Sequence, residues 1–444
     1  MADRPDFLAH LTTEQRRATL TVGRSLLVSA AAGAGKTSVL AERCASLVCD
    51  VEPPHRCGVA DLLVVTFTDA AADEMRGRIA AAIRKRLDRQ PRNEYLRRQL
   101  YQLDNAAIST IHAFCRTLIQ RWFPQAGIDP QATVLAADEA ELLKREVLDA
   151  LFLERYGLDT DEGRSFQTLV DIYGNGRDDP VADFVLRIHR FISSLPDPQR
   201  WLAAAVDRVQ PDSSAGLLAG LDALQNDRIE RALALHVEFG RELAAAIRRR
   251  WPIAETRADY IDRFVEQLDK WKAALSRQSP ENWLQVTEAI SAFQFDRLAP
   301  KPRRLGEQDG RAFDLAAEYV KRERDLFKSD IANGLCRFTP LEYRRGLEQI
   351  APHVRTLVDL VRQFDRRYTQ AKRDQAAVDF DDLQRLAYNL LTLDGDPTRP
   401  SEVARHVRDL YRYVLVDEFQ DVDPLQAAIL HCVSRESADP PHGN

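Results

Sequence analysis

Residues 26–38 read Leu26-Leu27-Val28-Ser29-Ala30-Ala31-Ala32-Gly33-Ala34-Gly35-Lys36-Thr37-Ser38. An apolar run that breaks into small residues and resumes as Val39-Leu40 predicts a strand, a loop and a helix. Small residues at such a turn let successive backbone N–H groups surround an anion, and the helix N-terminus adds partial positive charge. The stretch therefore predicts a site for the phosphates of a nucleotide.

The loop of this stretch supplies most of the predicted nucleotide-binding residues. Lys36 is expected to reach the outer phosphates, and the Thr37 hydroxyl is expected to bind Mg²⁺. Alanine replaces the leading glycine of the usual pattern, which reduces backbone freedom there. The predicted set consists of Ala30, Ala31, Ala32, Gly33, Ala34, Gly35, Lys36, Thr37 and Ser38.

A glutamine precedes the loop, in a predicted helix that starts near Leu11 with Thr12 or Thr13 as its N-cap. The amide of Gln15 can both donate to and accept from an adenine edge. On its own Gln15 would be an ordinary exposed helix residue. Its position just before the phosphate loop favours ATP as the nucleotide.

A second apolar run, Arg412 to Val416, ends in Asp417-Glu418-Phe419-Gln420-Asp421. Adjacent acids in a loop are usually only exposed to solvent, but an upstream phosphate loop favours a catalytic interpretation. Asp417 is then expected to hold the Mg²⁺ that Thr37 contacts, and Glu418 to orient or deprotonate the attacking water. The sequence thus predicts an ATP- and Mg²⁺-dependent site.

Two further strands are predicted, Leu62 to Thr66 and Ala106 to Ser109, each with polar side chains after it. Alternation of strands and helices predicts a parallel sheet with right-handed crossovers, in which ligands bind at the carboxyl ends of the strands. Thr66 and Thr68 are candidates for a phosphate and Phe67 for a base, although this segment alone favours Phe67 as a core residue. Similarly placed candidates are Thr110 and His112, and a lone histidine there is more often structural.

Length and composition place the chain among globular proteins. Its 444 residues suggest about two to four domains. The net charge of -6 neither indicates nor excludes a nucleic-acid partner, since a local basic groove is sufficient. No apolar run is long enough to span a membrane, and Met1 to Asp6 has no signal-peptide pattern, so we expect a cytoplasmic protein. The six cysteines show no zinc spacing and are expected to be reduced.

From about Trp122 to about Lys372 the pattern is helical almost throughout. Apolar positions recur every three to four residues without a sustained heptad, which predicts a compact bundle. Basic segments at Arg248-Arg249-Arg250 and at Lys301, Arg303 and Arg304 are interpreted as solvated helix ends, with DNA contact as the alternative. The predicted long helices are Leu217 to Arg250, Asp259 to Leu275, Phe313 to Ile331 and Tyr343 to Lys372.

The chain resembles the UvrD/Rep-like superfamily 1 DNA helicases in motifs that occur in the same order. They are Gln15, the loop from Ala30 to Thr37, Thr66-Phe67-Thr68, Asp379-Phe380-Asp381-Asp382-Leu383 and Asp417-Glu418-Phe419-Gln420-Asp421. Alanine at position 30 is frequent in that family. Ser109-Thr110-Ile111-His112-Ala113-Phe114-Cys115 and the helical insert are most similar to the AddA/RecB branch, the helicase-nuclease subunits of double-strand-break repair.

The resemblance implies an α/β fold: a RecA-like P-loop NTPase core with a parallel sheet, interrupted by a large all-α insert. Residues 1–123 would form the first part of the core, 124–375 the helical accessory domain, and 376–444 the second part with the acidic Walker B motif. Lys36, Asp417, Glu418 and Gln420 would be catalytic, with Gln420 sensing the γ-phosphate. Thr66, Phe67, Thr68, Thr110 and His112 would contact single-stranded DNA, whereas Asp69 replaces the family's usual asparagine.

The resemblance further implies a 3′–5′ DNA helicase or translocase of recombination and repair, acting on single- and double-stranded DNA with an AddB-like partner subunit. The family's second RecA-like core and its arginine finger, worth roughly 10³ to 10⁵ in rate, do not occur in this sequence. We therefore expect these 444 residues to hydrolyse ATP poorly and not to unwind DNA. Two alternatives are an ATPase of the SMC kind, which predicts heptads and a Leu-Ser-Gly-Gly signature, and a non-enzymatic fragment that binds DNA or a partner.

Overall fold

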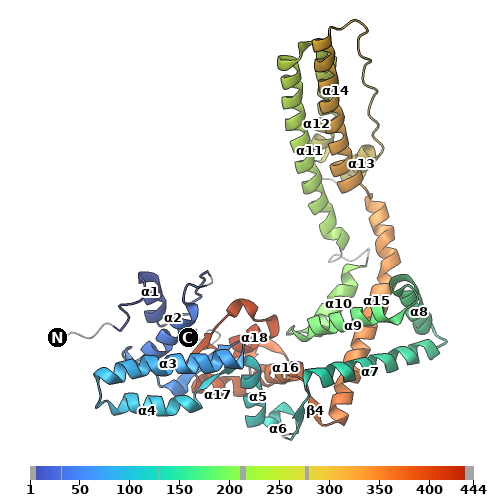
Figure 1. The fold of residues 1–444 in the computed structure, drawn as a ribbon. Coiled ribbons are helices and arrows are strands. Elements are labelled where there is room, and N and C mark those ends of the chain that lie inside the picture. Colours follow the sequence, from blue (N-terminus) through green and yellow to red (C-terminus); the bar gives the residue numbers. More distant parts are fainter. Residues whose placement is uncertain (1–6, 32, 130, 211–216, 276–279, 436–444) are drawn as a thin grey trace. The chain divides into compact units, whose positions relative to one another are not determined.

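The computed structural model describes residues 7–31, 33–129, 131–210, 217–275 and 280–435. They form two compact units, residues 1–201 with 359–444, and residues 202–358. The second unit lies inside the segment 124–375 that was predicted as an insert. The chain is mostly helical with a small parallel sheet (Figure 1).

The sheet of the first unit has the strand order β2-β1-β7, and both pairings are parallel. β1 (Leu62–Thr66) and β7 (Tyr413–Val416) match the predicted strands closely, and β2 (Ala107–Thr110) is displaced by one residue. β1 and β7 come from distant parts of the chain, so the sheet places the residues that follow β1 and the acidic loop that follows β7 at the same edge.

The other helices and strands of the first unit have the following bounds. The helices are α1 (Thr13–Leu20), α2 (Lys36–Cys49), α3 (Asp69–Arg89), α4 (Glu94–Gln102), α5 (Ile111–Arg121), α6 (Phe123–Ala126), α7 (Ala137–Gly157), α8 (Asp161–Gly174), α9 (Asp178–Ser193), α16 (Phe380–Leu391), α17 (Glu402–Leu410) and α18 (Pro424–Val433). Short 3₁₀ turns are η1 (Val59–Asp61), η2 (Leu103–Asn105) and η5 (Phe419–Asp421). The remaining strands form two small sheets, β3 (Thr133–Val134) with β4 (Ala377–Val378), and β5 (Thr392–Leu393) with β6 (Asp396–Pro400).

Helices cover both faces of the three-stranded sheet. Alternate residues of β1 point to opposite sides: Leu63 and Val65 pack with α5, α16, α17 and α18, while Leu62 and Val64 pack with α2 and α3. Every residue of β1 is buried, which explains its continuous apolar sequence. The predicted parallel sheet is confirmed for these strands.

The strand predicted at Leu26 to Val28 is wrong. These residues have no regular structure, and the side chain of Leu27 is 78% exposed. Their apolar character suits a strand, but a strand also needs a hydrogen-bonded neighbour. Within the described residues no segment pairs with them, so composition alone was misleading.

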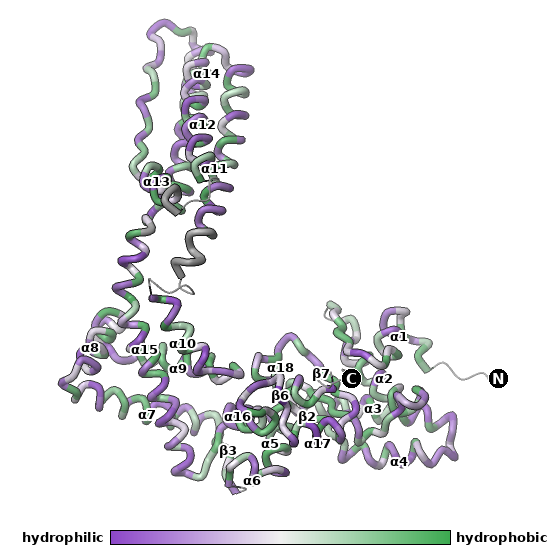
Figure 2. Tube along the Cα trace, turned by 180° about the vertical axis from the view of Figure 1, so that it is seen from behind, coloured by the Kyte–Doolittle hydropathy of each residue, from purple (hydrophilic) through white to green (hydrophobic). Residues whose placement is uncertain are grey.

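The second unit is a helical bundle. It contains α11 (Leu217–Arg250), η3 (Pro252–Ala254), α12 (Glu255–Leu275), α13 (Pro280–Ser291), α14 (Glu307–Phe327) and the π-helical η4 (Lys328–Leu335). Two helices, α10 (Pro198–Arg208) and α15 (Pro340–Asp374), contain residues of both units. Hydrophobic and hydrophilic residues alternate along α11, α12 and α14, as the predicted amphipathic helices require (Figure 2).

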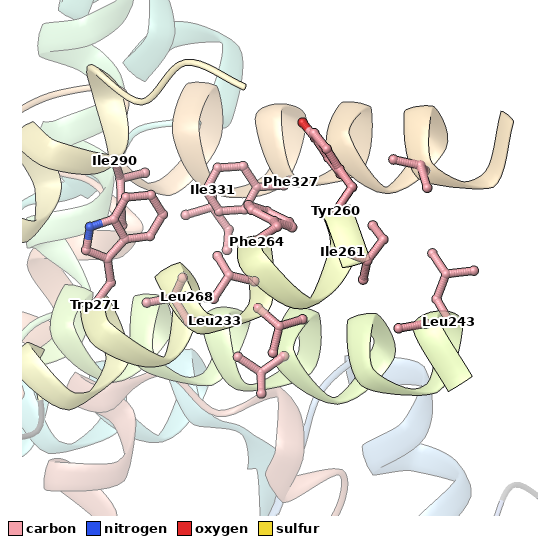
Figure 3. Packing of buried hydrophobic residues seen from close by; sticks show 14 of the residues in the cluster. Leu233, Leu243, Tyr260, Ile261, Phe264, Leu268, Trp271, Ile290, Phe327 and Ile331 are labelled. Carbon is pink, nitrogen blue, oxygen red and sulfur yellow. The ribbon is translucent and has the colours of Figure 1, made fainter. Parts of the chain in front are cut away.

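Aromatic residues dominate the core of this bundle. Phe264 of α12 meets Phe327 of α14 at a ring distance of 5.1 Å and an angle of 89° (Figure 3). Trp271 and Phe327 are stacked at 6.1 Å. Edge-to-face pairs of this kind add to the free energy gained by burying apolar area. The bundle therefore has its own core, as the predicted compact packing implied.

The structure also bears on the cysteines, on metal ligands and on membrane-spanning helices. All six cysteines are free thiols. Among the described residues no group of three or more His, Cys, Asp or Glu side chains is placed to hold a metal ion, and no helix is both long and apolar enough to cross a bilayer.

Candidate functional site

The phosphate loop and the acidic loop after β7 line one cavity of about 500 Å³. Its walls are residues 33–38 of the loop and of the first turn of α2, together with Arg78, Glu418 and Gln420. The predicted meeting of the two motifs is therefore visible as a shared cavity, although they come from opposite ends of the chain.

Two glycines give the phosphate loop its shape. Gly33 and Gly35 have φ of 78° and 79°, a backbone conformation that residues with a Cβ adopt at a cost of roughly 1–2 kcal/mol. Gly35 is the N-cap of α2, so the free N–H groups of the first helical turn face the cavity that the loop lines. This is the arrangement in which backbone amides bind an anion.

Lys36 lies folded against its own loop. Its Nζ donates to the carbonyl oxygen of Ala30 at 3.0 Å and lies 3.5 Å from that of Ala31. Ala32, the remaining predicted residue of the loop, lies outside the described residues. Both of these partners are neutral carbonyl groups, so they do not neutralise the positive charge of the ammonium group. This charge lies at the cavity and can bind an anionic ligand.

Gln15 is held next to the loop by a capping box at the start of α1. The Thr12 backbone N–H donates to Gln15 Oε1 at 2.9 Å, and Gln15 Nε2 donates to the carbonyl oxygen of Ala34 at 3.1 Å. Gln15 does not line the cavity itself. The structure therefore connects the predicted adenine-binding residue directly to the loop.

The acidic loop begins as a continuation of the sheet. The backbone N–H of Asp417 donates to the Val65 carbonyl oxygen at 2.9 Å, and the Asp417 carboxylate accepts from the N–H of Glu418 at 3.1 Å. Asp417 does not line the cavity, whereas Glu418 does. The side-chain amide of Gln420 donates to the carboxylate of Glu418, so these two predicted catalytic groups are direct partners.

Glu418 has a backbone conformation that is rare for its residue type. Its φ of 51° and ψ of 46° lie in the left-handed region, which costs a residue other than glycine about 1–3 kcal/mol. Such strain persists only where surrounding structure imposes it, and it is concentrated at functional sites. The strain supports the assignment of Glu418 to the site.

Arg78 of α3 was missed by sequence reasoning. One guanidinium nitrogen donates to Ser38 Oγ at 2.7 Å, and two others donate to Glu74. The sequence shows it only as one of several basic residues in a helix. Its contact with a residue 40 positions earlier has no signal in local spacing.

The carboxyl edge of the sheet carries the predicted DNA-binding residues, with different exposure. Phe67 is 68% exposed, so the interpretation from its own segment as a core residue is wrong; it follows the last residue of β1 and points away from the core. Thr66 is buried, and its hydroxyl donates to the Thr68 carbonyl oxygen. Thr68 and Thr110 cap α3 and α5 by accepting from Ala71 and Ala113.

His112 lies next to a further aromatic residue. Its ring meets Phe380 edge-on at 5.7 Å, and the side-chain amide nitrogen of Gln384 lies 2.8 Å from Nε2 of the histidine. Burial lowers the pKa of His112, although Asp423 is among the nearby carboxylates that oppose the shift. The lowered pKa keeps the imidazole neutral. Phe380, which is half-exposed, lies beside it at the carboxyl edge of the sheet.

The sequence of residues 11–439 matches the model of the UvrD/REP helicase N-terminal domain. The chain belongs to this family. Similar proteins include the AddA-type subunit of the ATP-dependent helicase/nuclease of Anoxybacillus flavithermus, 35% identical over 435 residues, and that of Moorella thermoacetica, 36% identical over 432 residues. Each alignment covers 96% of this chain but only 34% and 30% of those relatives, so the chain spans about a third of their length.

These similarities confirm the family and branch that the motifs suggested. The protein of Clostridium beijerinckii with the same name is 32% identical over 442 residues. An ATPase of the SMC kind is set aside, because membership of the UvrD/REP family accounts for both nucleotide motifs and for the helical segment between them.

Proposed function

We propose that this chain is the ATP- and DNA-binding part of an ATP-dependent 3′–5′ DNA helicase or translocase of recombination and repair, with a RecA-like core. The observation that carries the proposal is the single cavity lined by residues 33–38, Glu418 and Gln420. Residues 1–123 and 376–444 make the core in this proposal, and residues 124–375 are its accessory insert.

The residues present fit a magnesium nucleotide. The positive φ of Gly33 and Gly35 lets amides surround the phosphates, and Lys36 adds a charge for the outer ones. Thr37 and Asp417 supply the oxygen ligands that Mg²⁺ prefers. The ion, when bound, neutralises charge on the phosphates.

The remaining groups act on the attacking water and on the nucleotide. Glu418 would orient the water and accept its proton, and Gln420, its hydrogen-bonded partner, would sense the γ-phosphate. Gln15 would recognise adenine from the position that the capping box gives it. Arg78 joins this set as a cavity-lining cation.

Single-stranded DNA would pass along the carboxyl edge of the sheet. Phe67 and Phe380 offer exposed rings on which bases stack, a contact worth about 1–3 kcal/mol per base. The neutral His112 and the caps Thr68 and Thr110 lie at the same strand and helix ends. Because the relatives are named as subunits, an AddB-like partner belongs to the proposal.

Binding measurements on the chain test this function. Wild type should bind a fluorescent ATP analogue with Mg²⁺ and should also bind a labelled thymidine oligonucleotide. Lys36→Ala should weaken nucleotide binding by about 10- to 150-fold, the equivalent of one charged hydrogen bond at roughly 1.5–3 kcal/mol, and leave DNA binding intact. DNA binding without any nucleotide binding would instead identify a non-enzymatic DNA-binding fragment.

A further inference from the structure

A loop from the helical segment is held by two elements of the core at once. The loop, residues 193–196, begins with Ser193, the last residue of α9, and ends with Pro196. Arg385 of α16 donates through Nη1 to the Pro196 carbonyl oxygen at 2.8 Å, and through Nη2 to those of Ser193 and Leu195. From the other side, the backbone N–H of Leu425 donates to the Ser194 carbonyl oxygen at 2.8 Å. Four consecutive carbonyl groups are thus bound by α16 and α18.

Arg385 binds one carbonyl group at the end of α9, that of Ser193, and two beyond the helix, those of Leu195 and Pro196. The last carbonyls of a helix lack partners within the helix, and a nearby glycine or basic residue usually satisfies them. Here the guanidinium of Arg385 does so for Ser193 at 3.3 Å, and its positive charge is also favourable at a helix C-terminus. The fork of a guanidinium can bind several oxygens at once, which a lysine ammonium does with less geometric definition.

Arg385 is next in sequence to a residue that contacts the carboxyl edge of the sheet. Gln384, the preceding residue, contacts His112, and Phe380 begins the helix. The first turn of α16 is fixed in turn by the buried Lys372, whose Nζ lies 2.9 Å from Asp379 Oδ2 and 2.6 Å from Asp382 Oδ2. A shift of α16 would therefore displace His112 and Phe380 together.

α18 leads from the same loop to the nucleotide cavity. The helix is capped by Asp423, which accepts from Gln426 at 2.8 Å and lies two residues after the acidic loop. The first turn of α18 is thus joined to the acidic loop, Asp417 to Asp421, by two residues. Burial raises the pKa of Asp423, a shift that the backbone N–H groups of Gln426 and Leu425 oppose. Both α16 and α18 therefore bind the loop 193–196. α16 carries Phe380 and contacts His112 at the carboxyl edge of the sheet, and α18 is joined to the acidic loop of the nucleotide cavity.

We propose that Arg385 is a positioning residue that couples nucleotide binding to single-stranded DNA binding by holding the loop 193–196 against α16 and α18. The inference rests on the function proposed above and adds a residue that touches neither ligand. Removing the guanidinium leaves the cavity residues 33–38 and Glu418 with all their contacts, since Arg385 contacts none of them. Nucleotide affinity without DNA should therefore persist while its response to DNA is lost.

The experiment measures the dissociation constant of a fluorescent ATP analogue with Mg²⁺ in the presence and absence of a saturating thymidine oligonucleotide. We expect the ratio of the two constants to differ from one by at least about fivefold for wild type, and to lie within about twofold of one for Arg385→Met. Arg385→Lys should give an intermediate ratio. Arg405→Met, an exposed arginine of α17 changed in the same way, should retain the wild-type ratio.

Each other result overturns a specific claim. A wild-type ratio retained in Arg385→Met, or an affinity lost equally with and without DNA, would show that the arginine has no coupling role or only a structural one. If Arg385→Met fails to fold, Arg385→Lys decides by the same ratio. Wild type that binds both ligands without coupling overturns this inference alone, whereas wild type that binds neither overturns the proposed function and the inference with it.

Discussion

The shape of the phosphate loop gives a prediction whose magnitude follows from the structure. In Gly33→Ala the added methyl group meets no heavy atom within 4 Å, so the substitution causes no clash with neighbouring residues. The φ of 78° remains, and it costs an alanine roughly 1–2 kcal/mol. Because the loop binds phosphate only in this conformation, nucleotide affinity should fall by about 5- to 30-fold.

A matched glycine serves as the control. Gly77 lies inside α3, where an added Cβ also meets nothing within 4 Å and φ is not positive. Gly77→Ala should therefore leave nucleotide affinity unchanged and raise the free energy of unfolding by about 0.5–1 kcal/mol. Both variants would be titrated with the fluorescent ATP analogue and unfolded in urea. Wild-type affinity in Gly33→Ala would refute the claim that backbone conformation shapes the site.

Three further outcomes are expected from buried charges and from His112. Arg86→Met removes the 1%-exposed partner of Asp50 and should lower the free energy of unfolding in urea by about 3 kcal/mol, near the low end for a broken buried pair because Asp50 is 27% exposed; no loss would contradict the pairing. Lys372→Met should lower the free energy of unfolding by roughly 3–5 kcal/mol at neutral pH, because it leaves buried carboxylates without their partner. The loss should be smaller toward pH of about 4: burial and Asp379 raise the pKa of Asp382, and protonation of Asp382 removes one unpaired charge. Burial lowers the pKa of His112, so the unfolded chain binds this proton more readily and stability should fall as pH drops below about 6.5; His112→Gln should flatten that slope, and an unchanged slope would contradict it.

The sequence predicted those parts of the site that local pattern determines. Every residue of the strand Leu62 to Thr66 is buried between helix layers. Such a strand needs apolar residues on both faces, so the continuous apolar run in the sequence was enough to predict it. The glycines at 33 and 35 were recognisable for a similar reason, because few residues other than glycine adopt their φ readily. The family followed from such motifs and their order.

Features that depend on distant partners could not be predicted. Leu26 to Val28 has the composition of a strand, but whether a neighbouring strand exists is not a local property. Phe67 is as apolar as a core residue, and only the end of β1 decides that it is exposed. Arg78 reaches the cavity because α3 packs against α2, which carries Ser38, and no spacing of residues indicates this packing.

A double-mutant cycle between the two ends of the site tests the central claim most directly. Thr37→Ala and Asp417→Asn, alone and together, would be measured for Mg²⁺-dependent binding of the ATP analogue. If both side chains bind one ion, the second substitution should cost little once the first is made, with an interaction free energy of about 0.5–3 kcal/mol. Losses that add to within about 0.3–0.5 kcal/mol would show that the lysine loop and the acidic loop do not serve one magnesium nucleotide.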